Sequence, residues 1–205
     1  MGHVVIMELL GSFVFTLAIV LSNNPLTVGL VLMAMVYIGG HISGGHYNPA
    51  ISLASWVQRG LSNEGLLSYL AAQVLGAVLA VMVAGRIAMD SMLVTDVHPA
   101  RVMDQAFVEM FLTIIFVLLV LTVAKASAYK GAMVQGLVIG LGFAGLIGLQ
   151  AGVYLNPAAV LGRMIAGAFG GATWGTTQEL LVYVVSPLLG GAVAAWLYSY
   201  LNDRK

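Results

Sequence analysis

Six long apolar stretches divide the chain, and polar or glycine-rich segments separate them. None of the six carries more than one charged residue, and a hydrocarbon core of ~30 Å needs about 20 residues of helix. The pattern therefore predicts six membrane-spanning helices, at residues 4–21, 26–39, 66–85, 106–124, 132–149 and 180–201. The second stretch is short, and its helix is expected to begin at Pro25, because proline favours the first helical position.

Two shorter segments each begin with Asn-Pro-Ala after a glycine-rich run: Asn48, Pro49 and Ala50, and Asn156, Pro157 and Ala158. In each, the asparagine is expected to be the helix N-cap and the proline the first helical residue. A helix from Asn48 to about Trp56 rises only ~13 Å, so it cannot cross the bilayer; the second is expected to end near Ala166. Each segment should therefore enter the membrane and return on the same side. Irregular backbone at that depth implies a cavity or pore.

The two halves of the chain repeat one another. At equal spacing, Glu8, Ser12 and Phe15 correspond to Glu109, Thr113 and Phe116. Each half has three spans, an odd number, so the second half must be inverted, as in many channels and transporters. We expect one channel domain over residues 1–205, with one repeat at about 1–95 and the other at about 100–205.

Composition places the chain in the bilayer. It is 60% hydrophobic and 8% charged, with a mean hydropathy of +1.00, whereas soluble domains are about 25% charged. The net charge is zero and no basic cluster occurs, which argues against nucleic acid as a partner. Glu8 and the lack of a basic start argue that the first stretch is a retained helix and not a signal peptide.

Basic residues give the expected orientation. With both termini in the cytoplasm, five basic residues lie inside and three outside, which favours this arrangement. The inner set is Arg59, Lys125, Lys130, Arg204 and Lys205, and the outer set is Arg86, Arg101 and Arg163.

Two glutamates lie within apolar helices, where charged residues are functional candidates and need partners. We expect Glu8 and Glu109 to accept hydrogen bonds from backbone N–H groups of the re-entrant loops, which have no ladder to pair with. An interfacial position near the start of its helix is the alternative for Glu8.

The motifs resemble those of the aquaporin family, the major intrinsic proteins, over nearly the whole chain. The resemblance rests on residues 43–50, the second Asn-Pro-Ala, the two glutamates, and Gln73, Gly76 and Ala77 against Pro187 and Gly190. It implies six helices, two half-helices, a pore in each subunit, and a homotetramer. The implied activity is passive transport of water and small uncharged solutes, without enzymatic chemistry or a cofactor.

The half-helices are expected to point their positive N-termini at each other and so to raise the energy of any cation, including hydronium. Each asparagine oxygen caps its helix, and its NH2 donates to a passing molecule; the alternative is that both are only caps. By resemblance, His46 is expected to satisfy loop backbone groups, and His41 to line the cytoplasmic vestibule. Metal binding is not favoured, because histidines five apart have no diagnostic spacing.

The resemblance also assigns a selectivity filter, at Val28, Ala144, Val153 and Ala159. In the family an arginine commonly stands where this chain has Ala159. Four apolar residues resemble the wide filters that pass glycerol, peroxide, ammonia or undissociated metalloid acids, although the aspartate of many glycerol channels is replaced by Val160. Arg163 lies four residues beyond Ala159 on the same helix face. It either reaches back over Ala159 or extends outward to water.

Two other functional classes have different requirements. A secondary transporter needs coupling-ion ligands at the midplane, and the sequence has no charged candidates there besides Glu8 and Glu109. A structural membrane protein with a closed pore would show no flux. An enzyme is not expected, because no nucleophile–base pair or metal-ligand set occurs.

Overall fold

The computed structural model describes residues 2–87, 97–126, 134–150, 152–169 and 175–202. Within these ranges every regular element is a helix, and the predicted all-α fold is confirmed. In chain order the elements are α1 (Gly2–Leu21), α2 (Pro25–Ser43), α3 (Pro49–Val57), α4 (Asn63–Ile87), η1 (Pro99–Arg101), α5 (Val102–Lys125), α6 (Gln135–Ile147), α7 (Pro157–Phe169), α8 (Thr177–Leu180), η3 (Leu181–Val185) and α9 (Ser186–Asn202). Here η1 is a 3-10 helix and η3 a π-helix.

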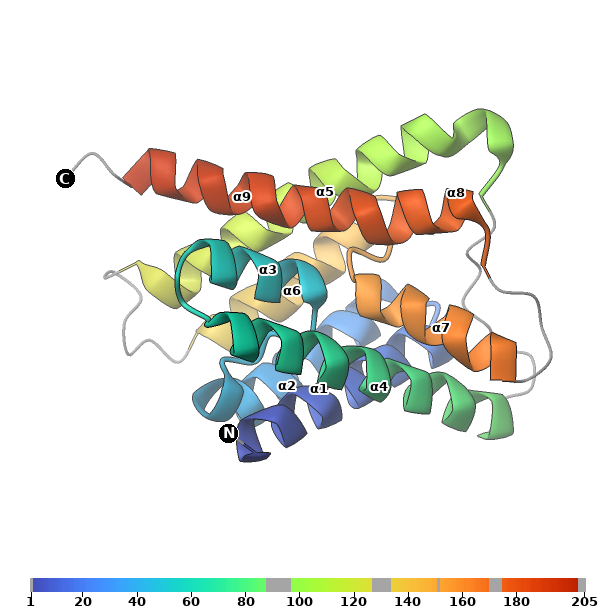
Figure 1. Cartoon of the computed structure of the whole chain (residues 1–205), viewed down its shortest axis with the longest axis horizontal. Helices are drawn as coiled ribbons and strands as arrows, with labels where there is room; N and C mark the ends of the chain where they lie inside the picture. The colour runs from blue at the N-terminus through green and yellow to red at the C-terminus, as the bar shows by residue number, and fades with distance from the viewer. Residues whose placement is uncertain (1, 88–96, 127–133, 151, 170–174, 203–205) are drawn as a thin grey trace.

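The long helices run along one axis and enclose the two short ones. Figure 1 shows α3 and α7 inside the bundle, each beginning near its middle and running toward opposite ends. The beginning of α1 and the end of α9 lie at the same end of the molecule. We call this the terminal end and the other the distal end. This is the arrangement expected of six spans with two re-entrant half-helices.

Helix lengths agree with the sequence pattern at most positions. Five helices, counting η1–α5 and α8–α9 as one each, are long and apolar enough to cross a membrane. Helix α6 has only 13 residues, Gln135–Ile147; its predicted first residues, 132 and 133, lie outside the described ranges. Helix α7 continues to Phe169, past the expected end near Ala166, because Gly167 and Ala168 do not interrupt it. Lys130, Arg204 and Lys205 also lie outside the described ranges.

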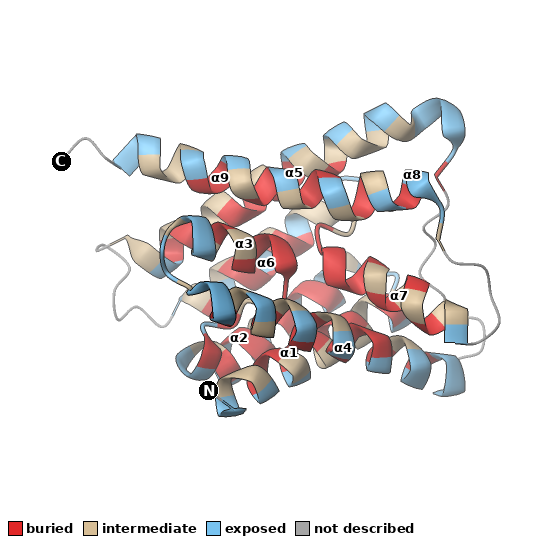
Figure 2. Ribbon diagram, viewed as in Figure 1, coloured by how far each residue is buried: buried red, intermediate tan, exposed pale blue. Residues whose placement is uncertain are grey.

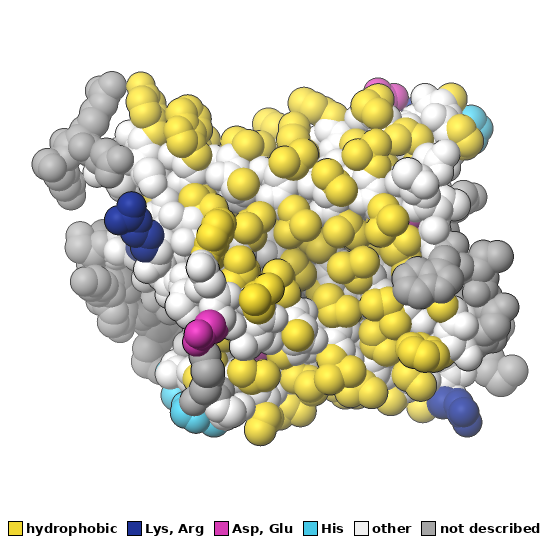
Figure 3. All heavy atoms as spheres, viewed as in Figure 1, with side chains coloured by type: hydrophobic (Ala, Val, Ile, Leu, Met, Phe, Trp, Pro, Cys, Tyr) yellow, Lys and Arg dark blue, Asp and Glu magenta, His cyan; other side chains and the backbone are white. Residues whose placement is uncertain are grey.

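The surface is that of a membrane protein. Figure 3 shows apolar side chains covering the middle of the visible face, and charged side chains near its two ends. Figure 2 shows the buried residues on the inward faces of the helices and on the two short helices. Five apolar helices of membrane-spanning length indicate an integral, multi-pass membrane protein.

Glycines bring the first and last spanning helices of each half into close contact. Gly76 of α4 lies on the backbone of α1, where an added Cβ would clash with the Leu9 carbonyl. In the second half, a Cβ added to Gly190 of α9 would lie 2.6 Å from the Met110 carbonyl oxygen of α5. Small residues allow such close approach of helix backbones in membranes.

The half-helices pack across the molecule. A Cβ on Gly162 of α7 would lie 2.6 Å from the Ala77 Cβ of α4, and one on Gly191 of α9 would lie 2.5 Å from the Ala50 oxygen of α3. Each half-helix is therefore in close contact with the last spanning helix of the opposite half. This packing of each half-helix on the opposite half places the N-termini of α3 and α7 in the middle of the bundle, where the site lies.

Candidate functional site

The two Asn-Pro-Ala segments have the same local structure. Asn48 Oδ1 accepts a hydrogen bond from the Ala50 N–H at 2.9 Å, and Asn156 Oδ1 accepts one from the Ala158 N–H at 3.0 Å. Both asparagines are 1% exposed. Each oxygen thus satisfies one N–H of the first helical turn, as an N-cap does, while Pro49 and Pro157 begin the helices.

The asparagine side chains also join the two loops to each other. Asn48 Nδ2 donates to the Leu155 carbonyl at 2.7 Å, and Asn156 Nδ2 donates to the Tyr47 carbonyl at 3.1 Å. These reciprocal bonds hold the positive ends of α3 and α7 beside each other. An amide NH2 has two N–H groups, so the second remains for a further acceptor. The sequence analysis did not predict that the first N–H binds the opposite loop.

The residue before each asparagine has an unusual backbone conformation. Tyr47 has φ 49° and Leu155 has φ 52°, in the left-handed region that costs non-glycine residues about 1–2 kcal/mol. In each case this is the residue whose carbonyl accepts the bond from the opposite asparagine. The reciprocal bonds and the glutamates below hold the two residues in this conformation.

Glu8 of α1 lies at the centre of the first loop's hydrogen bonds and is fully buried. It accepts bonds from the backbone N–H groups of His46 and Tyr47 at 3.0 and 2.8 Å. Its carboxylate also accepts from Ser43 Oγ at 2.6 Å and Gln73 Nε2 at 2.7 Å. Four donors on one carboxylate offset much of the cost of burying its charge.

Glu109 of α5 has the equivalent place in the second half and is 1% exposed. It accepts bonds from the N–H groups of Tyr154 and Leu155 at 2.7 and 3.0 Å. Tyr154 and Leu155 stand in the same positions before Asn156 as His46 and Tyr47 do before Asn48. The two glutamates thus hold the two loops by the same pair of backbone bonds.

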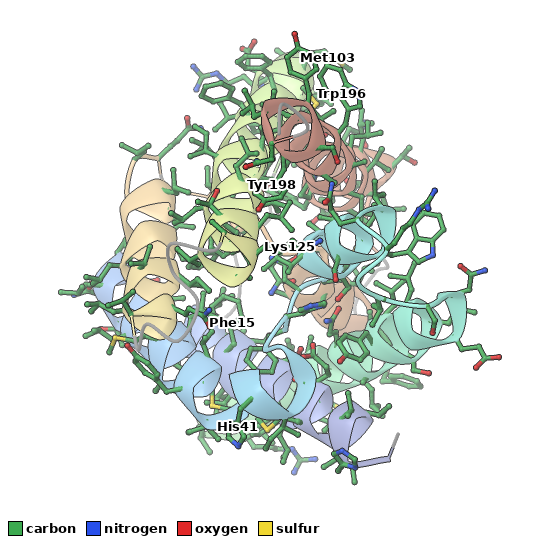
Figure 4. All side chains as sticks on the ribbon, turned by 90° about the vertical axis from the view of Figure 1, so that its left-hand side faces the viewer. Phe15, His41, Met103, Lys125, Trp196 and Tyr198 are labelled. Carbon is green, nitrogen blue, oxygen red and sulfur yellow. The ribbon has the colours of Figure 1, made fainter. Side chains whose placement is uncertain are left out.

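The histidines occupy different surroundings. The His46 ring contacts Ser52 through Nδ1 at 3.1 Å and packs edge-to-face on Tyr69, so its partner is a side-chain hydroxyl of α3 and not the expected loop backbone. His41 is exposed, and Figure 4 shows it at the edge of the bundle, whereas Lys125 lies near the middle.

Two glycines provide the space for the Tyr47 ring, and sequence reasoning missed both. A Cβ on Gly11 of α1 would overlap that ring, and one on Gly39 of α2 would overlap the hydroxyl of Tyr47 and the Met7 side chain. The ring is fully buried, and its hydroxyl donates to the Met35 carbonyl at 3.0 Å. The tyrosine next to Asn48 was the one available signal for a buried aromatic here.

An aromatic cluster lies in the core that surrounds the loops. Phe143 of α6 packs edge-to-face on Phe15 of α1 and Phe116 of α5, with ring centroids 5.1 and 5.0 Å apart. Figure 4 shows Phe15 near the middle of the bundle. Phe15 and Phe116 are one of the repeated pairs, so the cluster joins equivalent positions of the two halves.

The four predicted filter residues are all buried, at most 8% exposed. Val28 and Val153 belong to the largest core cluster, whereas Ala159 packs in a separate one with Val20 and Ala84. Ala144 lies where α6 crosses α2, within 2.5 Å of a Cβ built on Gly29. None of the four side chains has a hydrogen-bonding group.

Arg163 has a partner that the sequence analysis did not name. Its guanidinium Nη2 forms an ion pair with Glu179 Oε1 of α8. The contact lies between the half-helix α7 and the start of the last spanning helix. With 17% of its side chain exposed, Arg163 does not extend freely into water.

At the terminal end, Lys125 lies near the C-terminus of the half-helix α3. Its Nζ is 3.5 Å from the Gln58 carbonyl oxygen and 3.4 Å from Gln58 Oε1. Gln58 itself donates to the Ala195 carbonyl and to Ser199 Oγ of α9. A cation at a helix C-terminus is favourable because it faces the negative end of the dipole.

Several known proteins have similar sequences. Among them are Aquaporin NIP3-1 of Arabidopsis thaliana, 28% identical over 91% of this chain and 59% of its own length, and the probable aquaporin AqpM of Archaeoglobus fulgidus, 31% identical over 84% and 73%. The human lens fiber major intrinsic protein is 33% identical over 84% of this chain and 66% of its own length. The chain therefore spans about three fifths of the Arabidopsis relative.

The fold has a similar solved structure, the aquaglyceroporin from Plasmodium falciparum, with a TM-score of 0.80 and 24% sequence identity over 96% of this chain and 95% of that one. The family profile described as "Major intrinsic protein" matches residues 7–198. With these matches, the paired Asn-Pro-Ala loops and the inverted halves, the chain belongs to the major intrinsic protein family, whose members are channels and not enzymes.

Proposed function

We propose that the protein is a passive channel for water and small uncharged solutes. The observation that carries the proposal is the reciprocal bonding of Asn48 and Asn156 across two half-helices that begin at the centre of the bundle. In this arrangement two helix N-termini and two amide groups converge where a permeating molecule would pass. Groups of this kind bind a neutral hydroxyl weakly and oppose a cation.

Ion exclusion would arise from α3 and α7 themselves. Each N-terminus carries roughly half a positive elementary charge, and in a low-dielectric surrounding that charge is poorly screened. A water molecule that accepts a bond from an asparagine N–H is oriented with its own hydrogens turned away. It is then a poor relay for a proton at this point.

We further propose that Val28, Ala144, Val153 and Ala159 form a wide apolar filter. Their side chains offer no hydrogen bond, so a solute would gain polar contacts mainly from backbone carbonyls. Glycerol, peroxide, ammonia and undissociated metalloid acids are solutes that such a filter would admit. The Plasmodium protein with the similar fold is named an aquaglyceroporin, which is consistent with this class.

The test is a flux series in proteoliposomes, followed by stopped-flow light scattering with water, glycerol, urea and peroxide. We expect water and glycerol rates well above those of empty liposomes, and no change in an internal pH dye. In Ala159→Arg, glycerol flux should fall about tenfold while water flux is largely kept, because a charged donor narrows the path. A wild-type protein that passes water but excludes glycerol and urea would show the wide filter to be wrong.

The orientation and assembly are also proposals. We place the terminal end in the cytoplasm, because the five basic residues expected on that side outnumber the three expected outside; the five are Arg59, Lys125, Lys130, Arg204 and Lys205. The resemblance to the family implies a homotetramer, and the exposed apolar side chains leave surface for both lipid and neighbouring subunits. Native mass spectrometry and protease access in oriented vesicles test the two points.

Two alternatives predict different fluxes. A secondary transporter would move solute against its gradient when an ion gradient is applied. A structural membrane protein with a closed pore would remain assembled and show the water flux of empty liposomes. The flux series with and without an imposed proton gradient separates both from a passive channel.

A further inference from the structure

A partly buried ion pair lies in the distal half of the molecule, outside the Asn-Pro-Ala loops and the four filter positions. Arg163 and Glu179 form the only ion pair among the residues that the structure describes, and their side chains are 17% and 10% exposed. Such a pair is costly to desolvate, and removing one partner leaves a buried charge. The pair therefore strongly restricts where the Arg163 side chain lies.

Glu179 is the fixed partner of the two. Its Oε2 accepts the Thr176 N–H at 2.6 Å, and the Thr176 hydroxyl accepts the Glu179 N–H at 3.1 Å. This reciprocal pair is a capping box at the start of α8. One carboxylate oxygen is thus bound to the helix end, and the other is directed at Arg163. The Thr176 N–H fixes the position of the Glu179 carboxylate. Of the two side chains in the pair, Arg163 is therefore the one that can move to other acceptors.

Arg163 is placed to reach the filter when it is released. It lies four residues after Ala159 on α7, so the two share a helix face. Helical side chains lean toward the N-terminus, which for α7 is the direction of Asn156. The arginine Nε is buried and has no hydrogen-bond acceptor, so its present position leaves one of its five donors unsatisfied.

We propose that Glu179 is a specificity-determining residue that holds Arg163 away from Ala159 and thereby keeps the filter wide and uncharged. This inference rests on the proposed function, because it presumes that a solute larger than water passes Ala159. A released arginine would find acceptors among the backbone carbonyls near Val153. It would then add, from four residues away, the charged donor that the filter itself lacks.

The test is the variant Glu179→Gln, which removes the charge and keeps the capping box, since glutamine also serves at that position. We expect glycerol flux in proteoliposomes to fall about tenfold, while water flux changes by less than about threefold, because a charged donor obstructs the larger solute more. Adding Arg163→Met to this variant should restore glycerol flux to the wild-type level. Restoration identifies the released arginine, and not a distorted helix, as the obstruction.

The matched control is Asp104→Asn, an exposed carboxylate at the distal end of α5, which should leave both fluxes unchanged. If Glu179→Gln does not fold, Glu179→Asp keeps the charge and withdraws it by one methylene, and an intermediate fall in glycerol flux is expected. Wild-type glycerol flux in the folded Gln or Asp variant would overturn the inference. An absence of glycerol flux in the wild type would instead overturn the wide filter, on which the inference rests.

Discussion

At the scale of single residues, two carboxylates determine the shape of the central loops. Glu8 and Glu109 each accept two backbone N–H bonds from the residues just before an Asn-Pro-Ala motif. In hydrocarbon no water replaces these acceptors, so an unpaired N–H there is costly. The two buried carboxylates therefore contribute more to the stability of the fold than exposed carboxylates such as Glu64.

We expect Glu109→Ala to destabilise the protein by about 1–3 kcal/mol for each of the two N–H groups that it leaves unpaired. Glu8→Ala should cost more, because Ser43 also loses its acceptor and Gln73 loses one of its two acceptors. The measurements are thermal unfolding of purified protein in detergent and water flux after reconstitution. Glu64→Ala, at an exposed position of α4, is the control, and equal behaviour of all three variants would contradict this role.

Residue patterns predicted where the half-helices begin, and that both glutamates need hydrogen-bond donors, because these are local rules. The bonds from Asn48 to Leu155 and from Asn156 to Tyr47 were not predictable in the same way, because they join residues more than a hundred positions apart. Gly11 and Gly39 likewise give no sign of which distant ring occupies the space beside them. The pairing of Arg163 with Glu179 depends on the path of the chain between α7 and α8, and the hydrophobic periodicity of the sequence does not predict that path.

At the scale of elements, backbone contacts at glycines set the spacing of the helices. Gly76 and Gly190 are equivalent positions, and each lies against a carbonyl of the first helix of its own half. Gly85, on the same helix as Gly76, has no atom within 4 Å of an added Cβ. Helix α4 therefore has one glycine in close contact with another helix, Gly76, and one glycine with open space beside it, Gly85.

We predict that Gly76→Ala lowers stability by about 1–3 kcal/mol, because the added methyl forces α4 away from α1. Gly85→Ala should be neutral or stabilising by up to about 1 kcal/mol, because alanine is the better helix former. Unfolding temperatures in one detergent measure both. A Gly76→Ala variant as stable as Gly85→Ala would mean that the helices separate there without penalty.

At the scale of the whole molecule, the two halves are interleaved. Helix α3 packs on α9 and α7 packs on α4, so each half supplies the packing surface for the other's half-helix. The crossing of α2 and α6 at Gly29 and Gly140 adds a third contact between halves. Sequence repeats predicted the inversion but not this exchange of partners, which depends on the depth at which each half-helix ends.

We therefore expect fragments 1–95 and 96–205 to accumulate in membranes and conduct water only when they are produced together. Each fragment alone lacks the surface that buries its half-helix. Fragment levels and water flux of the vesicles measure the outcome, and Gly191→Leu, which would clash with the Ala50 carbonyl of α3, is the control for specific assembly. Water flux with one fragment alone would contradict the prediction.

The reciprocal asparagine bonds also have a consequence for biosynthesis. Leu155 follows Asn48 by 107 residues, and at ~5–20 residues per second the ribosome needs about 5–20 s to add them. Throughout that interval the Asn48 amide of the first re-entrant segment lacks its acceptor, the Leu155 carbonyl. Inside a membrane, a polar group without a hydrogen-bond partner costs several kcal/mol. A substitution near Leu155 that weakens this acceptor would therefore leave the first re-entrant loop without its partner after synthesis ends. Cellular quality control would then act on residues of the N-terminal half that carry no change themselves.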